Sequence, residues 1–282
     1  MKVLMIIILS IQGLIAEHPD IRTVAQNLFV PELSKSNPEA GKRVKLQLPK
    51  YKGTNLYHIL YLPKNWQAGK SYPVIVEYAG NGPYKNMYGD VSTGEVEGSV
   101  LGYGISEGKD YIWLCLPYVN KENTANQTQW WGDLKATVEY CKSAVKQICE
   151  QFGGDKKNLI LCGFSRGSIA CNYIGLHDKE IASLWKAFIC YSHYDGVRKW
   201  SYKGADTKSA LIRLKRLQER PQYIIQERSI EATKKYLSVS GIKGNYTFNA
   251  LPYRNHNASW VLRKTAAIAD LRLWLKKQLS SE

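Results

Sequence analysis

The residues with the clearest chemical potential lie near the middle of the chain, where glycines stand two positions before and two positions after a serine. The stretch reads Gly163-Phe164-Ser165-Arg166-Gly167; it follows an apolar run that suits a buried strand and precedes a helix-compatible segment. A sharp strand-to-helix turn of this kind strains the backbone of the central serine, and the glycines are needed because a Cβ would collide with the neighbouring elements. The sequence therefore predicts that Ser165 is a nucleophile.

A serine nucleophile needs a neighbouring base, and five histidines could supply it. His256 lies on a polar loop directly after the last strand-like segment, where the base stands when the order along the chain is serine, acid, histidine. His193, after an earlier strand-like run, is the competing candidate, whereas His58 lies inside a predicted strand and is interpreted as structural. The sequence favours His256, because a side chain on that final loop can reach the sheet edge above Ser165.

The third member of such a site is a carboxylate that fixes the tautomer of the base and stabilises its cation. Glu227 ends the strand-like segment before the last one, and the chain between Glu227 and His256 is long enough for one helix and one strand. Asp195 follows the strand after Ser165 and could approach His256 from the other side, and Glu231 is a third candidate. The sequence favours Glu227 over Asp195 but leaves the choice open.

Backbone N–H groups that stabilise a developing oxyanion are expected in a turn beside the nucleophile. Residues 72–78 read as a buried strand that ends in Ala-Gly-Asn-Gly-Pro, and a small turn at this place can aim free N–H groups at the reacting oxygen. Asn81 and Gly82 are therefore candidate donors, together with the N–H of Arg166. A long glycine-containing segment follows, up to Asp110, and is expected to overhang the same edge.

Two side chains are predicted to contact a substrate. Trp130 ends a polar loop and lies off the apolar face of the helix that follows, so its ring could stack on a substrate ring. The Arg166 guanidinium could add positive charge at the oxyanion or at a substrate carboxylate, and a salt bridge to a nearby acid is the alternative.

The elements that must position these residues alternate between strands and helices. An antiparallel pair is predicted at residues 44–48 and 56–62, with further strands at 72–78, 111–116, 159–162, 184–191, 221–226 and 246–251. Helical periodicity predicts an amphipathic helix over 131–152, a basic helical stretch over 209–220, and helices near 230–238 and 261–279. This alternation predicts an α/β fold with a mostly parallel central sheet flanked by helices on both faces.

The first residues are typical of a secretory signal peptide. Met1-Lys2 is followed by an apolar stretch to Ile15 that is too short to span a bilayer, and an uncleaved anchor is the alternative. We expect residues 1–16 to be a signal peptide, residues 17–42 a lead-in along the surface, and residues 43–282 one α/β domain. The mature protein is expected to be secreted or periplasmic, with no stable membrane association after cleavage.

Charge and cysteine content narrow the possible partners. The formal charge is +15, which becomes +14 without residues 1–16 because Lys2 is their only charged residue. The excess predicts attraction to polyanions, and an acidic polysaccharide fits an exported protein better than nucleic acid, for which no binding module is seen; a basic surface that serves solubility alone is the alternative. The six cysteines are expected to be mostly core residues. No structural zinc site is expected, because no Cys-x-x-Cys pair or histidine cluster with ligand spacing occurs, and no cofactor is expected.

Residues 44–279 resemble the α/β-hydrolase superfamily through the Gly-Phe-Ser-Arg-Gly motif, the Gly80-Asn81-Gly82 turn and the late His256. Within it the chain is most similar to secreted bacterial esterases of the esterase and polyester-depolymerase type, whose N-terminal arrangement matches residues 62–82. The resemblance implies ester hydrolysis through an acyl-enzyme, with oxyanion donors from the N–H groups of Arg166 and of Asn81 or Gly82. The turn departs from the family because no histidine precedes its glycines, and the favoured acid departs because it is a glutamate.

An arginine directly after the serine is also similar to the motif of glucuronoyl esterases, Gly-Cys-Ser-Arg-x-Gly-Lys, but Phe164, Ser168 and Ile169 break that match. We expect an exported serine esterase that acts on an acetyl, feruloyl or methyl ester of a polysaccharide, because 8 Trp and 19 Tyr offer stacking surfaces and the basic balance suits uronate-containing polymers. The alternatives are an exported peptidase of the same fold and a catalytically silent homologue that only binds glycan.

Overall fold

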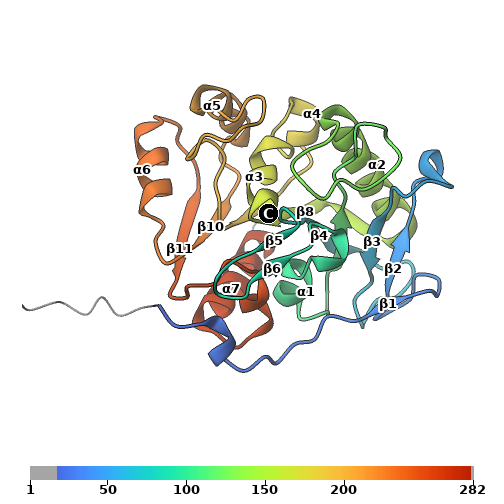
Figure 1. Cartoon of the computed structure of the whole chain (residues 1–282). Coiled ribbons are helices and arrows are strands. Elements are labelled where there is room, and N and C mark those ends of the chain that lie inside the picture. The colour runs from blue at the N-terminus through green and yellow to red at the C-terminus, as the bar shows by residue number, and fades with distance from the viewer. Residues whose placement is uncertain (1–17, 281–282) are drawn as a thin grey trace, which may run out of the picture.

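A nine-stranded, mostly parallel sheet runs through the protein, whose computed structural model describes residues 18–280 (Figure 1). The strand order is β1-β2-β3-β7-β4-β8-β9-β10-β11, and β3 is antiparallel to both of its neighbours. The strands are β1 (Leu33–Ser34), β2 (Arg43–Leu46), β3 (His58–Tyr61), β4 (Tyr72–Tyr78), β7 (Ile112–Leu116), β8 (Gly154–Phe164), β9 (Ala187–Tyr191), β10 (Gln222–Glu227) and β11 (Tyr246–Leu251). A separate small hairpin pairs β5 (Tyr84–Lys85) with β6 (Val91–Ser92).

Helices cover both faces of this sheet, as the alternating sequence pattern predicts. Figure 1 shows α1 and α7 on one face and the other helices on the opposite face. The helices are α1 (Leu101–Ser106), α2 (Leu134–Phe152), α3 (Arg166–Tyr173), α4 (Lys179–Ala182), α5 (Thr207–Leu214), α6 (Glu231–Val239) and α7 (Ala266–Ser280). Short 3-10 helices lie at Ile21–Thr23, Pro49–Tyr51, Val96–Gly98, Lys215–Leu217 and Ser259–Leu262.

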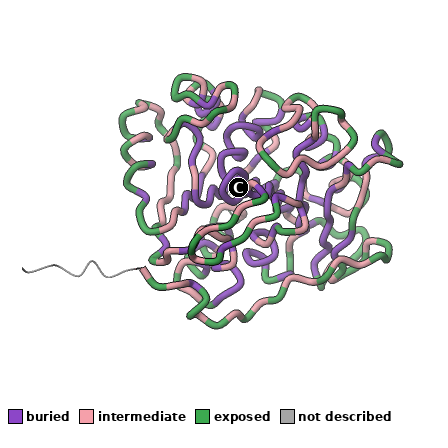
Figure 2. Tube along the Cα trace, viewed as in Figure 1, coloured by how far each residue is buried: buried purple, intermediate pink, exposed green. Residues whose placement is uncertain are grey.

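Two apolar cores form, one on each face of the sheet. Tyr78, Leu161 and Ile224 face the core beneath α2, α3 and α5, whereas Ile75 and Ile160 face the core beneath α1 and α7. Central strands are therefore apolar on both sides, which explains why they read as nearly continuous hydrophobic runs. Buried positions gather in the middle of the molecule, and exposed positions follow the outer helices and loops (Figure 2).

The helix boundaries differ from the predicted ones where a cap decides them. The helix predicted to start at residue 131 begins at Leu134, because the Asp133 side chain accepts the N–H of Ala136. It ends as expected at Gly153, which has a positive φ of 77°. The helix predicted over 261–279 begins only at Ala266, because the chain first makes a 3-10 turn at Ser259–Leu262.

The lead-in packs along the outside of the domain and adds a short edge strand. Ser34 pairs with Val44 of β2, and the Ile21 side chain is fully buried. Most of the lead-in predicted at residues 17–42 is thus visible, whereas the predicted signal peptide at residues 1–16 lies outside the described residues. None of the helices formed by residues 18–280 is long and apolar enough to cross a membrane.

The cysteines are free thiols in the structure. Five of the six are buried, and Cys149 is half-buried. Their burial agrees with the prediction that they are mostly small core residues.

Candidate active site

The backbone turns sharply at Ser165, between β8 and α3. Its φ of 55° and ψ of −113° are values that a residue with a side chain rarely adopts. A Cβ on Gly163 would lie 2.2 Å from the Gly167 backbone, and a Cβ on Gly167 would lie 1.9 Å from the carbonyl oxygen of Tyr78. Both distances are far inside van der Waals contact, so strand, turn and helix can cross here only if these positions are glycines. The turn places Ser165 at the carboxyl edge of the sheet.

His256 connects Ser165 to Glu227. Its Nε2 atom lies 3.1 Å from Ser165 Oγ, and its Nδ1 atom lies 3.0 Å from Glu227 Oε1. An ionised carboxylate only accepts hydrogen bonds, so Nδ1 carries the proton and Nε2 presents its lone pair to the serine hydroxyl. The three residues meet because Ser165 follows β8, Glu227 ends β10 and His256 lies on the loop after β11, and these strands run parallel on one side of the sheet.

The surroundings of Glu227 favour its ionised form. Burial alone would raise its pKa, but the hydrogen bond from His256 and the charge of that ring lower the pKa of Glu227 below its ordinary value. The carboxylate is thus available to orient the imidazole and to stabilise an imidazolium at neutral pH.

The other two candidate acids lie apart from the histidine. Asp195 forms a buried bidentate ion pair with Arg213 of α5, with N–O distances of 2.8 and 3.0 Å. Glu231 lies on α6, where it pairs with Lys234 at an exposed position. Among the three candidate carboxylates, only Glu227 has a hydrogen bond to His256.

His193, the competing base, lies beside His256 without replacing it. The centres of the two rings are 5.3 Å apart, and the ring of Trp200 lies 5.3 Å from His193 on another side. Burial and the proximity of His256 lower the pKa of His193 to about 4, so its imidazole is neutral at physiological pH. His193 therefore lines the site as an uncharged polar ring.

Ser192 is a residue of the site that the sequence reading missed. Its Oγ lies 3.1 Å from His256 Nδ1, so this hydroxyl is a second possible partner for the proton that Glu227 accepts. Its φ of 88° changes the direction of the backbone directly after β9. Nothing in the local sequence marks this serine, because its role depends on the position of a loop 64 residues away.

Asp90 is the second residue missed, and it holds the loop that carries His256. Its Oδ2 accepts the backbone N–H of His256 at 2.8 Å and the amide of Asn86 at 2.8 Å. Its Oδ1 accepts the amides of Asn255 at 2.9 Å and Asn257 at 2.6 Å. Although burial raises the pKa of Asp90, these hydrogen bonds lower it below its ordinary value. The Asn-His-Asn sequence is the only signal that could have pointed to this anchor.

The lead-in holds the same loop from outside. The Ile21 N–H donates to Asn255 Oδ1 at 2.7 Å, and the Arg254 N–H donates to the carbonyl of Pro19 at 3.2 Å. Segments from the two ends of the described chain therefore support the His256 loop together.

The turn after β4 lies against the nucleophile, as predicted, but only part of it can donate. A Cβ on Gly80 would lie 3.4 Å from the Cβ of Ser165. Gly82 is not available as an oxyanion donor, because its N–H already donates to the carbonyl of Thr128 at 3.0 Å. The N–H groups of Asn81 and Arg166 have no acceptor among residues 18–280, so these two can point at a reacting oxygen.

The Arg166 side chain does not face a substrate, which corrects the expectation from sequence. It is 1% exposed, lies 3.8 Å over the ring of Tyr118, and donates to the carbonyls of Trp130 at 2.7 Å, Gly80 at 2.8 Å and Gly94 at 3.3 Å. Burial lowers the pKa of Arg166 to about 10, so the group stays cationic at neutral pH. The guanidinium faces inward because three loops offer it their carbonyls, and it ties those loops together.

Trp130 lies half-buried in an aromatic cluster near the site. Its ring centre is 5.3 Å from that of Trp200 and 5.1 Å from that of Tyr202. The backbone N–H of Trp130 donates to Asn81 Oδ1 at 2.7 Å, so the cluster is attached to the oxyanion turn. Because His193 contacts Trp200, aromatic rings extend from Trp130 to the ring of the base.

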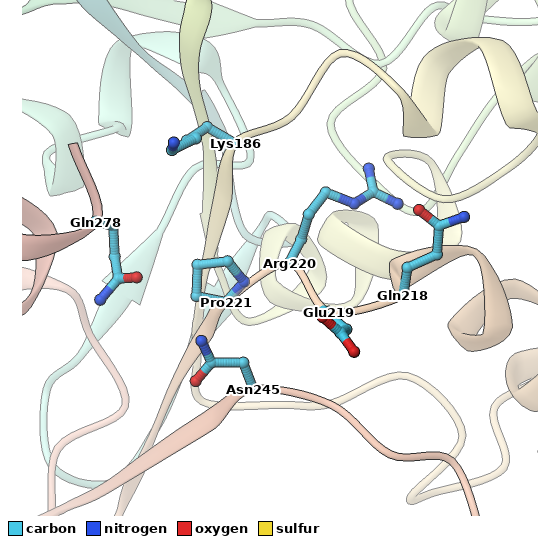
Figure 3. A pocket seen from close by; sticks show the side chains of 7 residues that line it. All are labelled: Lys186, Gln218, Glu219, Arg220, Pro221, Asn245 and Gln278. Atoms are coloured by element: carbon cyan, nitrogen blue, oxygen red, sulfur yellow. The ribbon is translucent and has the colours of Figure 1, made fainter. Parts of the chain in front are cut away.

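A cavity of about 760 Å³ lies at the edge of the sheet opposite to Ser165 (Figure 3). Lys186, Pro221 and Asn245 in its wall directly precede β9, β10 and β11, so it opens at the amino ends of these strands. The Arg220 guanidinium in its wall already donates to three backbone carbonyls. The cavity therefore belongs to a different region from Ser165.

Residues 18–280 contain no group of three His, Cys, Asp or Glu side chains that could hold a metal ion.

The sequence matches no family model and no curated protein, but the structure is similar to many solved ones. One is a thermostable esterase, with a TM-score of 0.50, 14% identity and coverage of 83% of this chain and 62% of that one. Another is a putative dipeptidyl aminopeptidase IV from Bacteroides ovatus, with a TM-score of 0.56, 12% identity and coverage of 84% and 35%. A third is an esterase from Rhizomucor miehei, with a TM-score of 0.54, 12% identity and coverage of 85% of both chains.

These likenesses confirm the predicted fold: the chain has the α/β-hydrolase fold, and its structural neighbours are esterases and dipeptidyl peptidases. Identities this low carry the fold and not the substrate. The chain also spans only about three fifths of the thermostable esterase and about one third of the aminopeptidase.

Proposed function

We propose that this α/β-hydrolase is a serine hydrolase that cleaves carboxylic esters through Ser165, His256 and Glu227. The observation that carries the proposal is the unbroken chain of hydrogen bonds from Ser165 Oγ through both nitrogens of His256 to Glu227. A nucleophile, a base and an orienting acid in this geometry are what acyl transfer requires.

In the first half of the reaction, Ser165 Oγ attacks the ester carbonyl carbon while His256 Nε2 takes the hydroxyl proton. Glu227 accepts the Nδ1–H throughout and stabilises the imidazolium that forms. The carbonyl oxygen, now an oxyanion, is stabilised by the N–H groups of Asn81 and Arg166. When the tetrahedral intermediate collapses, the C–O bond to the alcohol breaks, the alcohol takes the proton from Nε2, and an acyl-enzyme remains.

The second half repeats these steps with water as the nucleophile. His256 Nε2 takes a proton from the water, whose oxygen attacks the acyl carbon, and the same two N–H groups stabilise the second oxyanion. Collapse breaks the bond to Ser165 Oγ, which recovers its proton from His256. The products are the free carboxylic acid and the enzyme in its starting state.

The finer proposal is that the substrate is a polysaccharide ester, carrying an acetyl, feruloyl or methyl group, and that the enzyme is exported to the periplasm or beyond the cell. The aromatic cluster around Trp130 supports a sugar-binding role, because aromatic faces stack on sugar rings. The net charge of +15 supports an acidic polymer as the partner. The apolar N-terminal sequence supports export and release from the membrane after signal cleavage.

A second candidate function is peptide hydrolysis, which the dipeptidyl aminopeptidase among the structural neighbours favours. The experiment compares turnover of p-nitrophenyl acetate with that of aminoacyl p-nitroanilides, using the native protein and the Ser165→Ala variant. Ester turnover that disappears in Ser165→Ala supports the proposal, and preferred cleavage of an anilide replaces esterase with peptidase. No turnover of either class leaves a glycan-binding homologue and refutes both enzyme functions.

A further inference from the structure

A cavity of about 210 Å³ lies against the turn after β4, and none of the three triad residues is among those that line it. Its wall includes Gly80 of the oxyanion turn, Phe164 directly before the nucleophile, and Asn257 directly after the base. The segment from Val91 to Val100 closes the other side. We call this space the Gly80 cavity. Phe164, Asn257 and Gly80 are the sequence neighbours of Ser165, His256 and Asn81. We therefore expect the cavity to lie within reach of a substrate bound at these residues.

The position of the Gly80 cavity assigns it to the acyl side of an ester. The acyl carbon is bonded to Ser165 in the acyl-enzyme, and its oxygen faces the turn that contains Gly80 and Asn81. The leaving alcohol must instead lie near His256 Nε2, which protonates it; the ring of His193 lies beside His256, and Trp200 in turn lies beside His193. A group that extends from the acyl carbon along Gly80 therefore enters the cavity.

The cavity wall contains polar groups whose hydrogen-bonding capacity is unused. Ser99 is 3% exposed, and no nitrogen or oxygen atom of the described residues satisfies its hydroxyl. Glu95 is half-buried, and its carboxylate forms no hydrogen bond or ion pair with residues 18–280. By contrast, Glu77 is saturated by three backbone N–H groups and the indole of Trp113. The available capacity is therefore a carboxylate that accepts and a hydroxyl that can do either.

We propose that the Gly80 cavity selects acyl groups that end in a hydrogen-bond donor, a hydroxyl or a protonated amino group, which the Glu95 carboxylate accepts. This inference rests on the proposed esterase function and names the substrate class of that same site. A water molecule takes about 30 Å³ in the liquid, so the cavity holds about seven non-hydrogen atoms. An acyl chain of up to that length beyond the carbonyl fits.

The negative charge of Glu95 and Glu97 disfavours acyl groups that end in a carboxylate. Burial raises the pKa of Glu95, and the negative charge of Glu97 raises it further, while Lys45 and Arg166 oppose them from a distance. Glu97 itself is engaged by Lys45 and by the Tyr57 hydroxyl. A donor at Glu95 relieves this unpaired acidic spot, whereas a carboxylate on the acyl group would be repelled.

The test uses three p-nitrophenyl esters whose acyl chains have equal length and differ only at the end: heptanoate, 6-hydroxyhexanoate and 6-aminohexanoate. Each places six non-hydrogen atoms beyond the carbonyl, within the seven that fit. Values of kcat/KM are measured for the native protein, for Glu95→Met, which removes the acceptor at similar side-chain length, and for the matched control Glu97→Met. A hydrogen bond to a charged acceptor predicts a preference of about tenfold to hundredfold for at least one donor-ended ester over heptanoate.

The Glu95→Met variant should lose that preference while still turning over heptanoate, whereas Glu97→Met should keep the preference. A larger loss for the amino than for the hydroxy ester identifies the donor as a cation, and equal losses identify a hydroxyl site. Heptanoate turnover without a donor preference, or a preference that survives in Glu95→Met, refutes the cavity proposal alone. Absence of turnover for all three esters refutes the esterase function as well.

Discussion

Two carboxylates at the carboxyl edge of the sheet, the buried Asp195 and the half-buried Glu227, should respond differently to amide substitution. Glu227 lies 3.0 Å from His256 Nδ1, whereas Asp195 is paired with Arg213. At 3.0 Å and an effective dielectric constant of about 20, an imidazolium and a carboxylate attract each other by about 5 kcal/mol. Since about 1.4 kcal/mol is tenfold in rate, Glu227→Gln should lower kcat by up to about 10⁴-fold. Ser192 beside Nδ1 offers a substitute acceptor, so the expected loss is about 10²- to 10⁴-fold.

Asp195→Asn should lower the free energy of unfolding more than Glu227→Gln does. Asp195→Asn leaves Arg213 buried without its ionic partner, which typically costs about 3–5 kcal/mol of unfolding free energy. Glu227→Gln removes one charge-assisted hydrogen bond near the surface and should cost about 2 kcal/mol or less. Both variants are measured by p-nitrophenyl ester hydrolysis and by urea unfolding, with temperature held well below the Asp195→Asn transition. Equal losses of kcat, or a larger loss in Asp195→Asn, would refute the assignment of Glu227 as the acid.

Three further perturbations test the surroundings of the site. Asp90→Ala removes three hydrogen bonds from the loop of His256 and should lower kcat about tenfold or more with little change in KM, as measured by ester kinetics; a rise in KM alone would contradict the positioning role. Gly167→Ala forces a Cβ to 1.9 Å from a backbone oxygen and should cost about 1–3 kcal/mol of stability and most of the activity. Gly69→Ala meets no atom within 4 Å, so it should keep the activity even though its φ of 81° costs some stability. The fully buried His58 has its pKa lowered from 6.5 to about 3, so between these values the unfolded chain binds the extra proton and stability rises with pH. Urea unfolding between pH 4 and 6.5 should show a slope of up to about 1.4 kcal/mol per pH unit from this residue. Because His193 contributes in the same window, the slope is compared with that of His58→Gln, and an unchanged slope in that variant would contradict the burial of His58 as a neutral ring.

The fold and the Ser165–His256 pair could be predicted because local patterns encode them. Gly-Phe-Ser-Arg-Gly after an apolar run specifies a strand-to-helix turn, and strands alternating with helices specify a parallel sheet whose carboxyl ends share one edge. Glu227 could be favoured for the same reason, since it ends a strand. These residues could be assigned to one edge of the sheet because the order of strands and helices can be followed in a single sequence.

The environment of each side chain could not be predicted, because it depends on contacts between distant segments. Arg166 was expected to face a substrate, yet the carbonyls of three separate loops draw its guanidinium inward. Gly82 was expected to donate to an oxyanion, yet Thr128 from another loop takes its N–H. Asp90 lies 166 residues before the histidine loop that it holds, and no local pattern marks it.

The central claim is that Ser165 is an activated nucleophile, and covalent labelling tests it most directly. The protein is treated with a p-nitrophenyl alkylphosphonate, and the mass of the intact protein and of its peptides is measured beside the release of p-nitrophenol. We expect one phosphonyl group per chain, on the peptide that contains Ser165, with stoichiometric p-nitrophenol release and loss of ester hydrolysis. Labelling should vanish in Ser165→Ala and slow strongly in His256→Ala. A folded native protein that takes up no label, or takes it up at another residue while ester hydrolysis continues, would contradict the account.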